Sequence, residues 1–462
     1  MDELLSKLLQ GRVFGLNDAP VREQQDFVLL WLHGQRRAVN NLAFEHAQRR
    51  ANELRKPLVV YEGLRRDYPY ASARFHQFVL EGLRETARDC AERGVAYGFF
   101  LETEASPRGT LHKLASRAAV VVLDVLPHFV HPQQAKALAV RAPCRVEGVD
   151  AAGVAPLSMF PRAEEGARTL RPKLLRALPE LLQPIPQIPA RVAQPASFDF
   201  GFDPFRGSPQ EGTALAQVTS VVAPAEGIEG GRRKGLARVS KFVRETLPGY
   251  AERRNHPAEE NTSGLSAYLH FGHLCAAEIA LHAQASDAPR ADVEAFLDEL
   301  LVRRELAYNF VARTANHDSL EALPGWARAT LREHQRDQRP ALPSDEDLEA
   351  ARSPDELWNA MQRQLLREGR IHGWLRMLWG KTLLFWSSTP EDAYRRIRTF
   401  NDKYALDGRD STSAANFLWC FGLHDRPFPE RNIFGTVRSM TLDQARKKRH
   451  LDGYLRRYAD VG

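Results

Sequence analysis

The chain has 462 residues, of which 43% are hydrophobic and 26% charged, which is typical of a globular protein with two or three domains. The net charge of +6 and the isoelectric point near 9.1 are compatible with a polyanionic partner. No apolar run is long enough to cross a membrane, and the amino terminus MDELLSKLLQGR lacks the apolar core of a signal peptide, so we expect a cytoplasmic protein. The absence of a CxxC pair disfavours a disulfide framework or a cysteine-bound metal cluster for Cys90, Cys144, Cys275 and Cys420.

Residues 26–150 alternate apolar stretches typical of strands with helical stretches. Strands are predicted at 26–32, 57–64, 94–102, 118–126 and 144–150, and helices at 38–55, 72–94, 110–116 and 132–141. This alternation predicts an α/β domain over residues 22–152, a doubly wound parallel sheet with helices on both faces. Its loops contain neither GxGxxG nor GxxxxGK[ST], so no standard dinucleotide or P-loop fingerprint is present.

The remainder of the chain divides into a connector and a helical half. Residues 153–232 are rich in Pro and Gly, notably QPIPQIPARVAQP (183–195) and FDFGFDPFRGSP (198–209), which predicts an extended interdomain connector. Residues 233–462 show helical periodicity without comparable strand runs, which predicts an all-α domain.

Five of the seven tryptophans lie between Trp358 and Trp419. Trp379 and Trp386 are seven residues apart in HGWLRMLWGKTLLFW (372–386), about two turns of a predicted helix, so both indoles lie on one helix face. Trp358 is on the preceding helical stretch and would meet the same face if the two helices pair. The spacing allows two interpretations, packing in a core or an electron relay beside a bound aromatic cofactor.

The segment NTSGLSAYLHFGH (261–273) runs from a polar loop into a helix. The hydroxyls of Thr262, Ser263 and Ser266 at the helix start suit either a pyrophosphate or simple capping. His270 and His273 are three residues apart, but no third ligand at metal-site spacing follows, so a zinc site is not expected.

Two further segments carry charged residues beside apolar ones. Glu299 and Arg303 are an i,i+4 pair, which fits a surface ion pair or a carboxylate that faces a pocket. Trp419 begins WCFGLHDRPFPER (419–431), a rigid basic loop in which the indole could stack on a base and Arg426 and Arg431 could meet phosphates.

Five motifs follow one another in the helical half: TSGLSAYLHFGH, ELLVRRELAYNF, GRIHGWLRMLWGKTLLFW, FNDKYALDGRDS and WCFGLHDRPFPERNIFGTVR. In this order they closely resemble the class II branch of the photolyase/cryptochrome family, the cyclobutane pyrimidine dimer DNA photolyases, over essentially residues 25–458. The resemblance implies that the helical domain holds FAD in a U-shaped conformation. It also implies light-driven repair, in which excited reduced FAD gives an electron to a flipped-out dimer in damaged DNA. We then expect a monomer with no obligatory protein partner, associated with the nucleoid in a bacterium.

The resemblance also implies a role for individual residues. FAD would be held by Tyr250, Thr262, Ser263, Gly264, Leu265, Ser266, Arg376, Asp407 and Asn401, the last facing flavin N5. Electrons would pass to the flavin through Trp379 beside it, then Trp358, then Trp386 at the surface. Glu299 would hydrogen-bond the damaged bases and Trp419 would pack against them. DNA would be bound by Arg254, Arg303, Trp419, Arg426, Arg431 and Arg438.

Some positions depart from the family pattern. Phe417 stands where other classes keep a relay tryptophan, Arg303 where some members pack the lesion with Trp, and Ala267 where Pro or Asn is usual. The loops after the first and fourth predicted strands also differ, so the presence and identity of an antenna chromophore stay open.

Two alternative functions remain. A cryptochrome-like blue-light photoreceptor would use the same flavin and tryptophan relay. The residues Glu299, Asn401 and Trp419, and a chain that stops soon after its basic tail, favour repair. A light-independent DNA-binding flavoprotein is supported by the basic charge alone.

Overall fold

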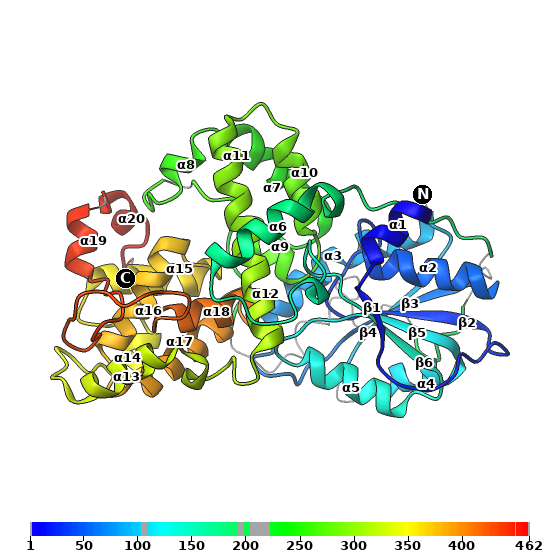
Figure 1. Cartoon of the computed structure of the whole chain (residues 1–462), viewed down its shortest axis with the longest axis horizontal. Coiled ribbons are helices and arrows are strands. Elements are labelled where there is room, and N and C mark those ends of the chain that lie inside the picture. Colours follow the sequence, from blue (N-terminus) through cyan, green and yellow to red (C-terminus); the bar gives the residue numbers. More distant parts are fainter. Residues whose placement is uncertain are drawn as a thin grey trace.

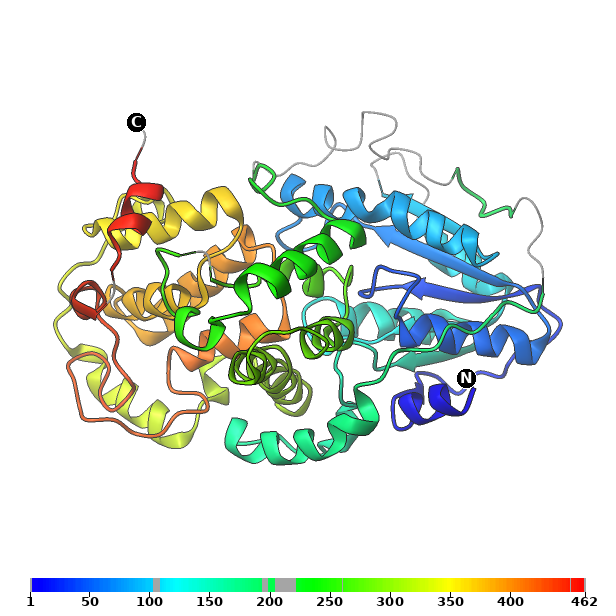
Figure 2. The same cartoon turned by 90° about the horizontal axis from the view of Figure 1, so that it is seen from above.

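The computed structural model describes residues 2–102, 109–192, 198–203, 222–259, 261–448 and 450–460. A sheet with flanking helices forms one end of the molecule and a region of helices forms the other, as Figure 1 shows. This arrangement confirms the predicted order of an α/β domain followed by a helical domain. In Figure 2 the amino terminus again lies at the sheet end and the carboxyl terminus at the far end of the helical region.

The sheet has six strands in the order β1-β6-β5-β2-β3-β4. Five of them are parallel and lie within the predicted strands: β2 (Phe27–Leu32), β3 (Leu58–Leu64), β4 (Ala96–Leu101), β5 (Ala118–Asp124) and β6 (Arg145–Val149). β1 (Val13–Gly15) pairs antiparallel with β6 and follows helix α1 (Asp2–Leu9), so the sheet begins upstream of residue 22. A three-residue edge strand is too short to show a hydrophobic period, which explains why it was not predicted.

Both faces of the sheet are covered, because alternate residues of β2 enter two different cores. Val28, Leu30 and Leu32 join the core beneath α2 (Leu42–Leu54) and α3 (Ala73–Glu92). Phe27, Leu29 and Trp31 join the core beneath α4 (Thr110–Arg117) and α5 (His131–Arg141). All six residues of β2 are buried, which is why the strand reads as a continuous apolar run.

The connector differs from the expectation. The prediction of an extended chain over 153–232 is wrong for residues 167–181, which form helix α6 (Ala167–Leu181) after the short turn η1 (Leu157–Met159). Pro172 and Pro179 lie inside α6 and concealed its helical pattern. The helix forms nevertheless because Leu170 and Leu174, four residues apart, are buried on one face.

The carboxyl-terminal half consists of helices. Its first elements are α7 (Arg232–Lys241), the π-helical turn η4 (Phe242–Thr246), α8 (Tyr250–Arg253), α9 (Ser266–His270), α10 (Ala276–Gln284), α11 (Arg290–Leu297), the π-helical turn η5 (Asp298–Arg303) and α12 (Arg304–Arg313). The later ones are η6 (Leu320–Ala322), α13 (Gly325–Glu333), η7 (His334–Arg336), α14 (Asp345–Glu349), α15 (Glu356–Glu368), α16 (Gly373–Phe385), α17 (Pro390–Tyr404), α18 (Ser411–Trp419), α19 (Leu442–Lys448) and α20 (Asp452–Arg457). Within the described ranges, no helix has the length and apolar character to span a bilayer.

Candidate active site

Three buried indoles form a contact chain in the core between α15 and α16. The rings of Trp358 and Trp379 are nearly parallel, 9° apart, with centroids separated by 6.1 Å. The ring of Trp386 lies 5.7 Å from that of Trp358 at an angle of 60°. Both separations are those of directly interacting aromatic pairs. The order Trp379, Trp358, Trp386 thus follows from geometry, whereas the chain alone allowed it only if the helices paired.

Hydrogen bonds fix the orientation of two of these rings. The Nε1–H of Trp379 donates to Oε1 of Gln362 at 3.0 Å, and the Nε1–H of Trp358 donates to the carbonyl of Trp379 at 3.2 Å. Trp386 was expected at the surface, but only 5% of it is exposed. It follows Phe385, the last residue of α16, and the packing of neighbouring helices covers it. Trp374, which lies on another side of α16, packs at the edge of the same core.

The predicted charged pair is present one turn before Trp379. Nη2 of Arg376 lies 3.0 and 3.1 Å from the two carboxylate oxygens of Asp407, and both side chains are largely buried. Asn401, on α17, is also buried, and its amide donates to Asp402 at 3.4 Å. Asp402 in turn accepts the backbone N–H of Arg409 at 2.9 Å. The segment that follows α17 is therefore folded back onto Asn401.

The close approach of this segment needs a glycine. A Cβ at Gly408 would lie 2.9 Å from the carbonyl oxygen of Asn401 and 3.0 Å from that of Ala405. Any other residue would push the Asp407 side of the loop away from α17, because side-chain atoms do not approach backbone oxygens that closely. Gly408 thus keeps Asp407 and Asn401 on adjoining parts of one site.

The loop before α9 has hydroxyls that are not used for capping. No side chain caps α9, whose N-cap residue is Leu265. Leu265 is buried, whereas Thr262, Ser263 and Gly264 are half-buried and Ser266 is exposed. The capping alternative raised by the sequence therefore does not apply to this helix, and the hydroxyls have no hydrogen-bond partner among the residues that the structure describes.

Arg238 is a candidate residue that the sequence did not single out. Its Nε–H donates to the carbonyl of Ser263 at 2.7 Å. Gly264 has φ +62°, and a Cβ there would lie 2.1 Å from Nη2 of Arg238. A guanidinium is thereby held against the hydroxyl-bearing loop, where it suits a phosphate. Arg238 lies on α7, in a basic run that reads as an ordinary solvated helix, so only the fold reveals its position.

Tyr250 packs edge-to-face against two aromatic residues of the helical domain. Its ring meets Phe242 at 5.7 Å and Phe296 at 5.6 Å, both nearly at right angles. The guanidinium carbon of Arg254 lies 5.9 Å from the centre of the same ring. Tyr250 is buried and Arg254 is half-buried, so the pair connects the interior of the helical domain with its surface.

Glu299 lies in η5, the π-helical turn between α11 and α12. It keeps contact with solvent, but crowding by neighbouring protein atoms raises the pKa of its carboxyl, while Arg303 and Arg254 partly offset that rise. Such π-helical turns occur frequently at functional sites, because the extra residue re-aims side chains. Here the turn presents a carboxyl with a raised pKa between two arginines.

Arg303 and Trp419 are in contact. The guanidinium carbon of Arg303 lies 5.3 Å from the centre of the indole ring, and its Nε lies 3.5 Å from a carboxylate oxygen of Asp298. The indole also meets His424, whose ring lies 6.3 Å away at 89°. Phe417, the departure from other classes, is buried in the core.

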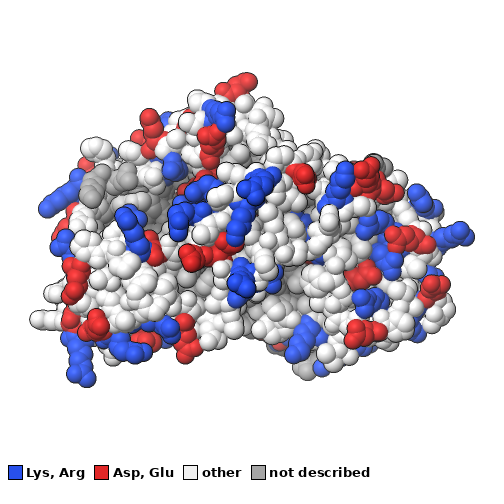
Figure 3. Space-filling model, in the orientation of Figure 1, with Lys and Arg blue, Asp and Glu red and all other residues white. Residues whose placement is uncertain are grey.

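The remaining predicted DNA contacts are exposed arginines of the loop after α18. Arg426, Arg431 and Arg438 are all exposed. Arg431 is held in a bridge with Gly435, and the guanidinium of Arg438 lies 5.7 Å from the ring centre of Phe428. Figure 3 shows that Lys and Arg side chains gather across the middle of one face of the molecule.

The two histidines considered for a metal have separate partners. Nδ1 of His270 lies 3.3 Å from Asp410, whereas the ring of His273 stacks on Phe78 and its Nδ1 accepts the backbone N–H of Gly231. Over the described part of the chain, no group of three or more His, Cys, Asp or Glu side chains is arranged to hold a metal ion.

A cavity of about 480 Å³ lies where the sheet meets the helical domain. It opens at the carboxyl ends of the parallel strands, where α/β sheets bind ligands. Its lining includes Trp31, His33, Tyr61 and Phe100 from the sheet and His270, Phe271, Tyr308 and Arg409 from the helical domain. The family resemblance implied that any antenna chromophore would sit in the α/β domain, without locating its site.

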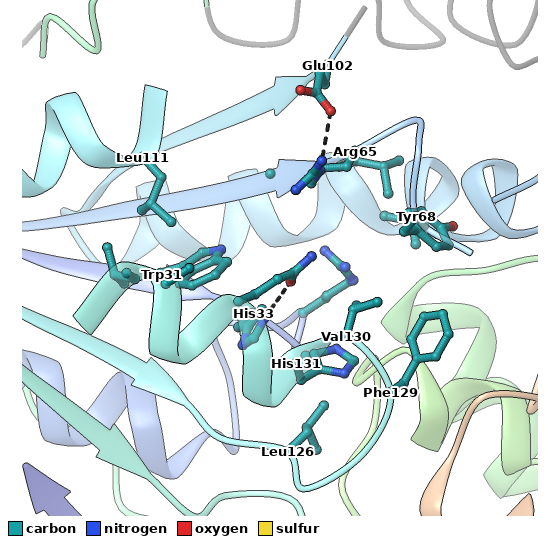
Figure 4. Close-up of a pocket in the computed structure, with 18 of the residues that line it drawn as sticks. Trp31, His33, Arg65, Tyr68, Glu102, Leu111, Leu126, Phe129, Val130 and His131 are labelled. Carbon is teal, nitrogen blue, oxygen red and sulfur yellow. Dashed lines mark hydrogen bonds and ion pairs between the residues drawn. The ribbon is translucent and has the colours of Figure 1, made fainter. Parts of the chain in front are cut away.

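Aromatic rings and histidines dominate one side of the cavity. Figure 4 shows Trp31 and His33 beside His131, with the ion pair of Arg65 and Glu102 at another edge. The centroids of Trp31 and His33 are 4.0 Å apart, and those of His33 and His131 are 4.7 Å apart. Burial lowers the pKa of both histidines, so this wall is uncharged at neutral pH and suits a flat ring.

Comparisons with known proteins agree with this architecture. A family model for DNA photolyase matches residues 28–190. The deoxyribodipyrimidine photo-lyase of Methanothermobacter thermautotrophicus is 35% identical over 454 residues, which cover 96% of the chain and 97% of that protein. That of Potorous tridactylus is 33% identical, and the match covers 93% of the chain and 81% of that protein.

Solved structures share the fold at lower identity. A class III photolyase from Agrobacterium tumefaciens has a TM-score of 0.67 at 18% identity, over 94% of the chain and 86% of that protein. A cryptochrome from Synechocystis has a TM-score of 0.70 at 12% identity, over 94% and 88% respectively. The architecture is thus the photolyase/cryptochrome fold.

Relatives of higher sequence identity show which family within this fold the chain belongs to. Because relatives more than 30% identical span nearly the whole chain, it belongs to the deoxyribodipyrimidine photo-lyase family of enzymes. This confirms the resemblance seen in the motifs of the helical half.

Proposed function

We propose that the protein repairs cyclobutane pyrimidine dimers in DNA with light absorbed by reduced FAD. The observation that carries this proposal is the near full-length similarity to the Methanothermobacter deoxyribodipyrimidine photo-lyase. It is supported by a buried indole chain that ends one turn from the Arg376–Asp407 pair, and by Arg303, which lies close to both a surface carboxyl, Glu299, and the Trp419 indole.

The residues present fit FAD. Arg238 and the free hydroxyls of Thr262, Ser263 and Ser266 would hold the pyrophosphate. Arg376, Asp407 and the amide of Asn401 would border the flavin ring, because Gly408 keeps this segment folded against α17. When bound, FAD supplies the light absorption and the electron that opens the cyclobutane ring. The neighbouring residues supply position, hydrogen bonds and exclusion of water.

On the DNA side, different residues would contact the damaged bases and the phosphates. A pyrimidine dimer is poorly stacked and therefore cheap to extrude from the duplex. Trp419 offers a face for stacking, and Glu299 in its protonated form would donate a hydrogen bond to a base carbonyl as negative charge develops on it. Arg254, Arg426, Arg431 and Arg438 would bind the phosphates on either side. Trp379, Trp358 and Trp386 would carry electrons inward when the flavin is oxidised.

The test is light-dependent repair by the purified protein. The reduced protein is incubated with an oligonucleotide that contains one thymine dimer, in blue light and in darkness, and intact thymines are measured. Recovery in light alone is expected. If thymines are not recovered although light still reduces the flavin, the repair proposal fails and the photoreceptor alternative is favoured.

We also propose that the cavity between the domains holds an antenna chromophore. Trp31 and the uncharged histidine wall would stack on a flat heteroaromatic ring, and Arg65 and Arg141 line the same cavity and would meet anionic groups. The purified protein should then carry an absorption band beyond that of flavin, and Trp31→Ala should remove it while the flavin remains. A spectrum accounted for by one flavin per chain would contradict this proposal.

A further inference from the structure

The side chain of Arg303 covers one face of the Trp419 indole. Its guanidinium carbon is 5.3 Å from the ring centre, a separation that leaves no space for a base between them. Glu299 is four residues earlier in the same turn, and the charge of Arg303 partly offsets the rise that burial causes in its pKa. Arg303 therefore lies close to both the Trp419 ring and the Glu299 carboxyl.

Trp419 itself is fixed in place. His424 meets it at right angles, and the Nδ1–H of His424 donates to the carbonyl of Glu165 at 2.8 Å. The next residue, Cys420, is tied through its carbonyl to the ammonium of the buried Lys381 at 2.9 Å. Rotation of the indole would disturb its contact with His424, so we expect this face to open through its other partner, Arg303.

Arg303 is the partner that can move. About a third of its side chain is exposed, and its ion pair with Asp298 is long at 3.5 Å. Asp298 makes its shorter contact, 2.8 Å, with Arg171 of α6. A guanidinium held by one long ion pair and one ring contact can swing away at little cost, because each such contact changes an equilibrium by only about twofold to fivefold.

We propose that Arg303 is a removable cover on the lesion-binding face of Trp419, and that it sets the threshold for accepting two adjacent flipped-out bases. This inference rests on the proposed repair function. Stacking on an aromatic ring changes binding by roughly fivefold to a hundredfold per base, so a dimer can displace Arg303. Undamaged bases must also lose their stacking and pairing in the duplex, and the cover adds to that penalty.

The first test measures the cover without DNA. The emission of Trp419 is obtained as the difference between the protein and its Trp419→Phe variant, and quenching by acrylamide is measured. Arg303→Met keeps a side chain of similar length but removes the guanidinium, so Trp419 should become at least about twofold more accessible. Unchanged quenching would show that Arg303 does not cover Trp419, whether or not the protein repairs DNA.

The second test measures discrimination. Arg303→Met should tighten binding to a dimer-containing oligonucleotide about threefold to fivefold. Binding to the undamaged oligonucleotide should change little, because its bases stay stacked and do not reach Trp419. Arg290→Met is the matched control, because it removes one positive charge from an exposed side chain of α11, and it should change both affinities equally. If Arg303→Met instead weakens dimer binding more than undamaged binding, Arg303 is a direct lesion contact and the inference is wrong. If the unsubstituted protein neither prefers the dimer-containing oligonucleotide nor repairs it, the proposed function fails. The acrylamide measurement still tests whether Arg303 covers Trp419.

Discussion

Trp379 connects two parts of the site, because its indole stacks on Trp358 and its helix carries Arg376 one turn earlier. Trp379→Phe should slow photoreduction of oxidised flavin by at least about tenfold, or about 1.4 kcal/mol in barrier, because it removes the first relay indole. Repair by pre-reduced protein should be nearly unchanged. Flash photolysis and single-turnover repair separate these effects. Trp374→Phe, on the same helix but outside the contact chain, is the control and should leave both rates alone.

At Glu299 the pKa sets the direction of a pH effect. The pKa is raised, chiefly by crowding of the carboxyl, so the protonated donor persists to higher pH than for an ordinary Glu. Repair per absorbed photon should therefore fall as the pH rises through that raised pKa. Glu299→Gln, a donor at every pH, should flatten the profile. Glu294→Gln, in the exposed pair with Arg290, should not, and an identical profile in all three proteins would remove Glu299 from this role.

For single residues, the sequence indicated which side chains could carry the chemistry, but not which residues they contact. Glu299, Trp419 and the tryptophans of the proposed relay were predicted from motifs, and the structure brings Trp358 against Trp379 and Trp386 as the helical spacing allowed. Arg238 and His424 were missed, because each acts through contacts with residues far away in sequence. The surface position expected for Trp386 was wrong, because burial depends on which helices cover the end of α16.

At the scale of elements, the loop that enters α9 depends on Gly264. Its φ of +62° is unfavourable for other residues, and a Cβ would collide with Arg238. Gly264→Ala should displace Arg238 and weaken FAD binding by about tenfold, or about 1.4 kcal/mol. Gly325→Ala is the control, because a Cβ there meets nothing within 4 Å. Flavin retained after dialysis measures the effect, and equal retention would exclude Arg238 from the cofactor site.

Helices and strands with a clear hydrophobic periodicity were predicted well, and those with a weak periodicity were not. The five parallel strands and the helices between them lie close to their predicted bounds, because each buries a long apolar face. The edge strand β1 has three residues and α6 contains two prolines, so neither shows a clear period. The π-helical turn η5 leaves no mark in the sequence, since its extra residue changes geometry and not composition.

At the scale of the whole molecule, the domains are joined by buried polar groups. Arg37, before α2, donates to the carbonyl of Gly272 at 2.7 Å, and Arg74 of α3 donates to the carbonyl of Tyr404 at 2.7 Å. Glu305 of α12 accepts the backbone N–H of Val154, which follows β6. These bonds hold the sheet against the helices that carry the site, and no periodicity in the sequence could have revealed them.

Glu305 makes this junction sensitive to pH. Burial raises its pKa to about 7, so the folded state keeps a proton that the unfolded chain has already lost. Stability should then fall as the pH rises from the ordinary range of Glu to about 7, by about 1.4 kcal/mol per pH unit at most. Glu305→Gln should show a smaller loss of unfolding free energy between pH 5 and pH 8 in urea titrations. An equal loss in both proteins would mean that Glu305 is not the titrating group.

The segment 407–411 borders both proposed ligand sites. Asp407 pairs with Arg376 beside the proposed flavin, while Arg409, Asp410 and Ser411 line the cavity between the domains. A substitution that reshapes the cavity wall also strains the backbone that positions Asp407. Natural selection on either ligand therefore acts on the same few residues, and drift in this segment should be slow even in lineages that have lost one of the two ligands.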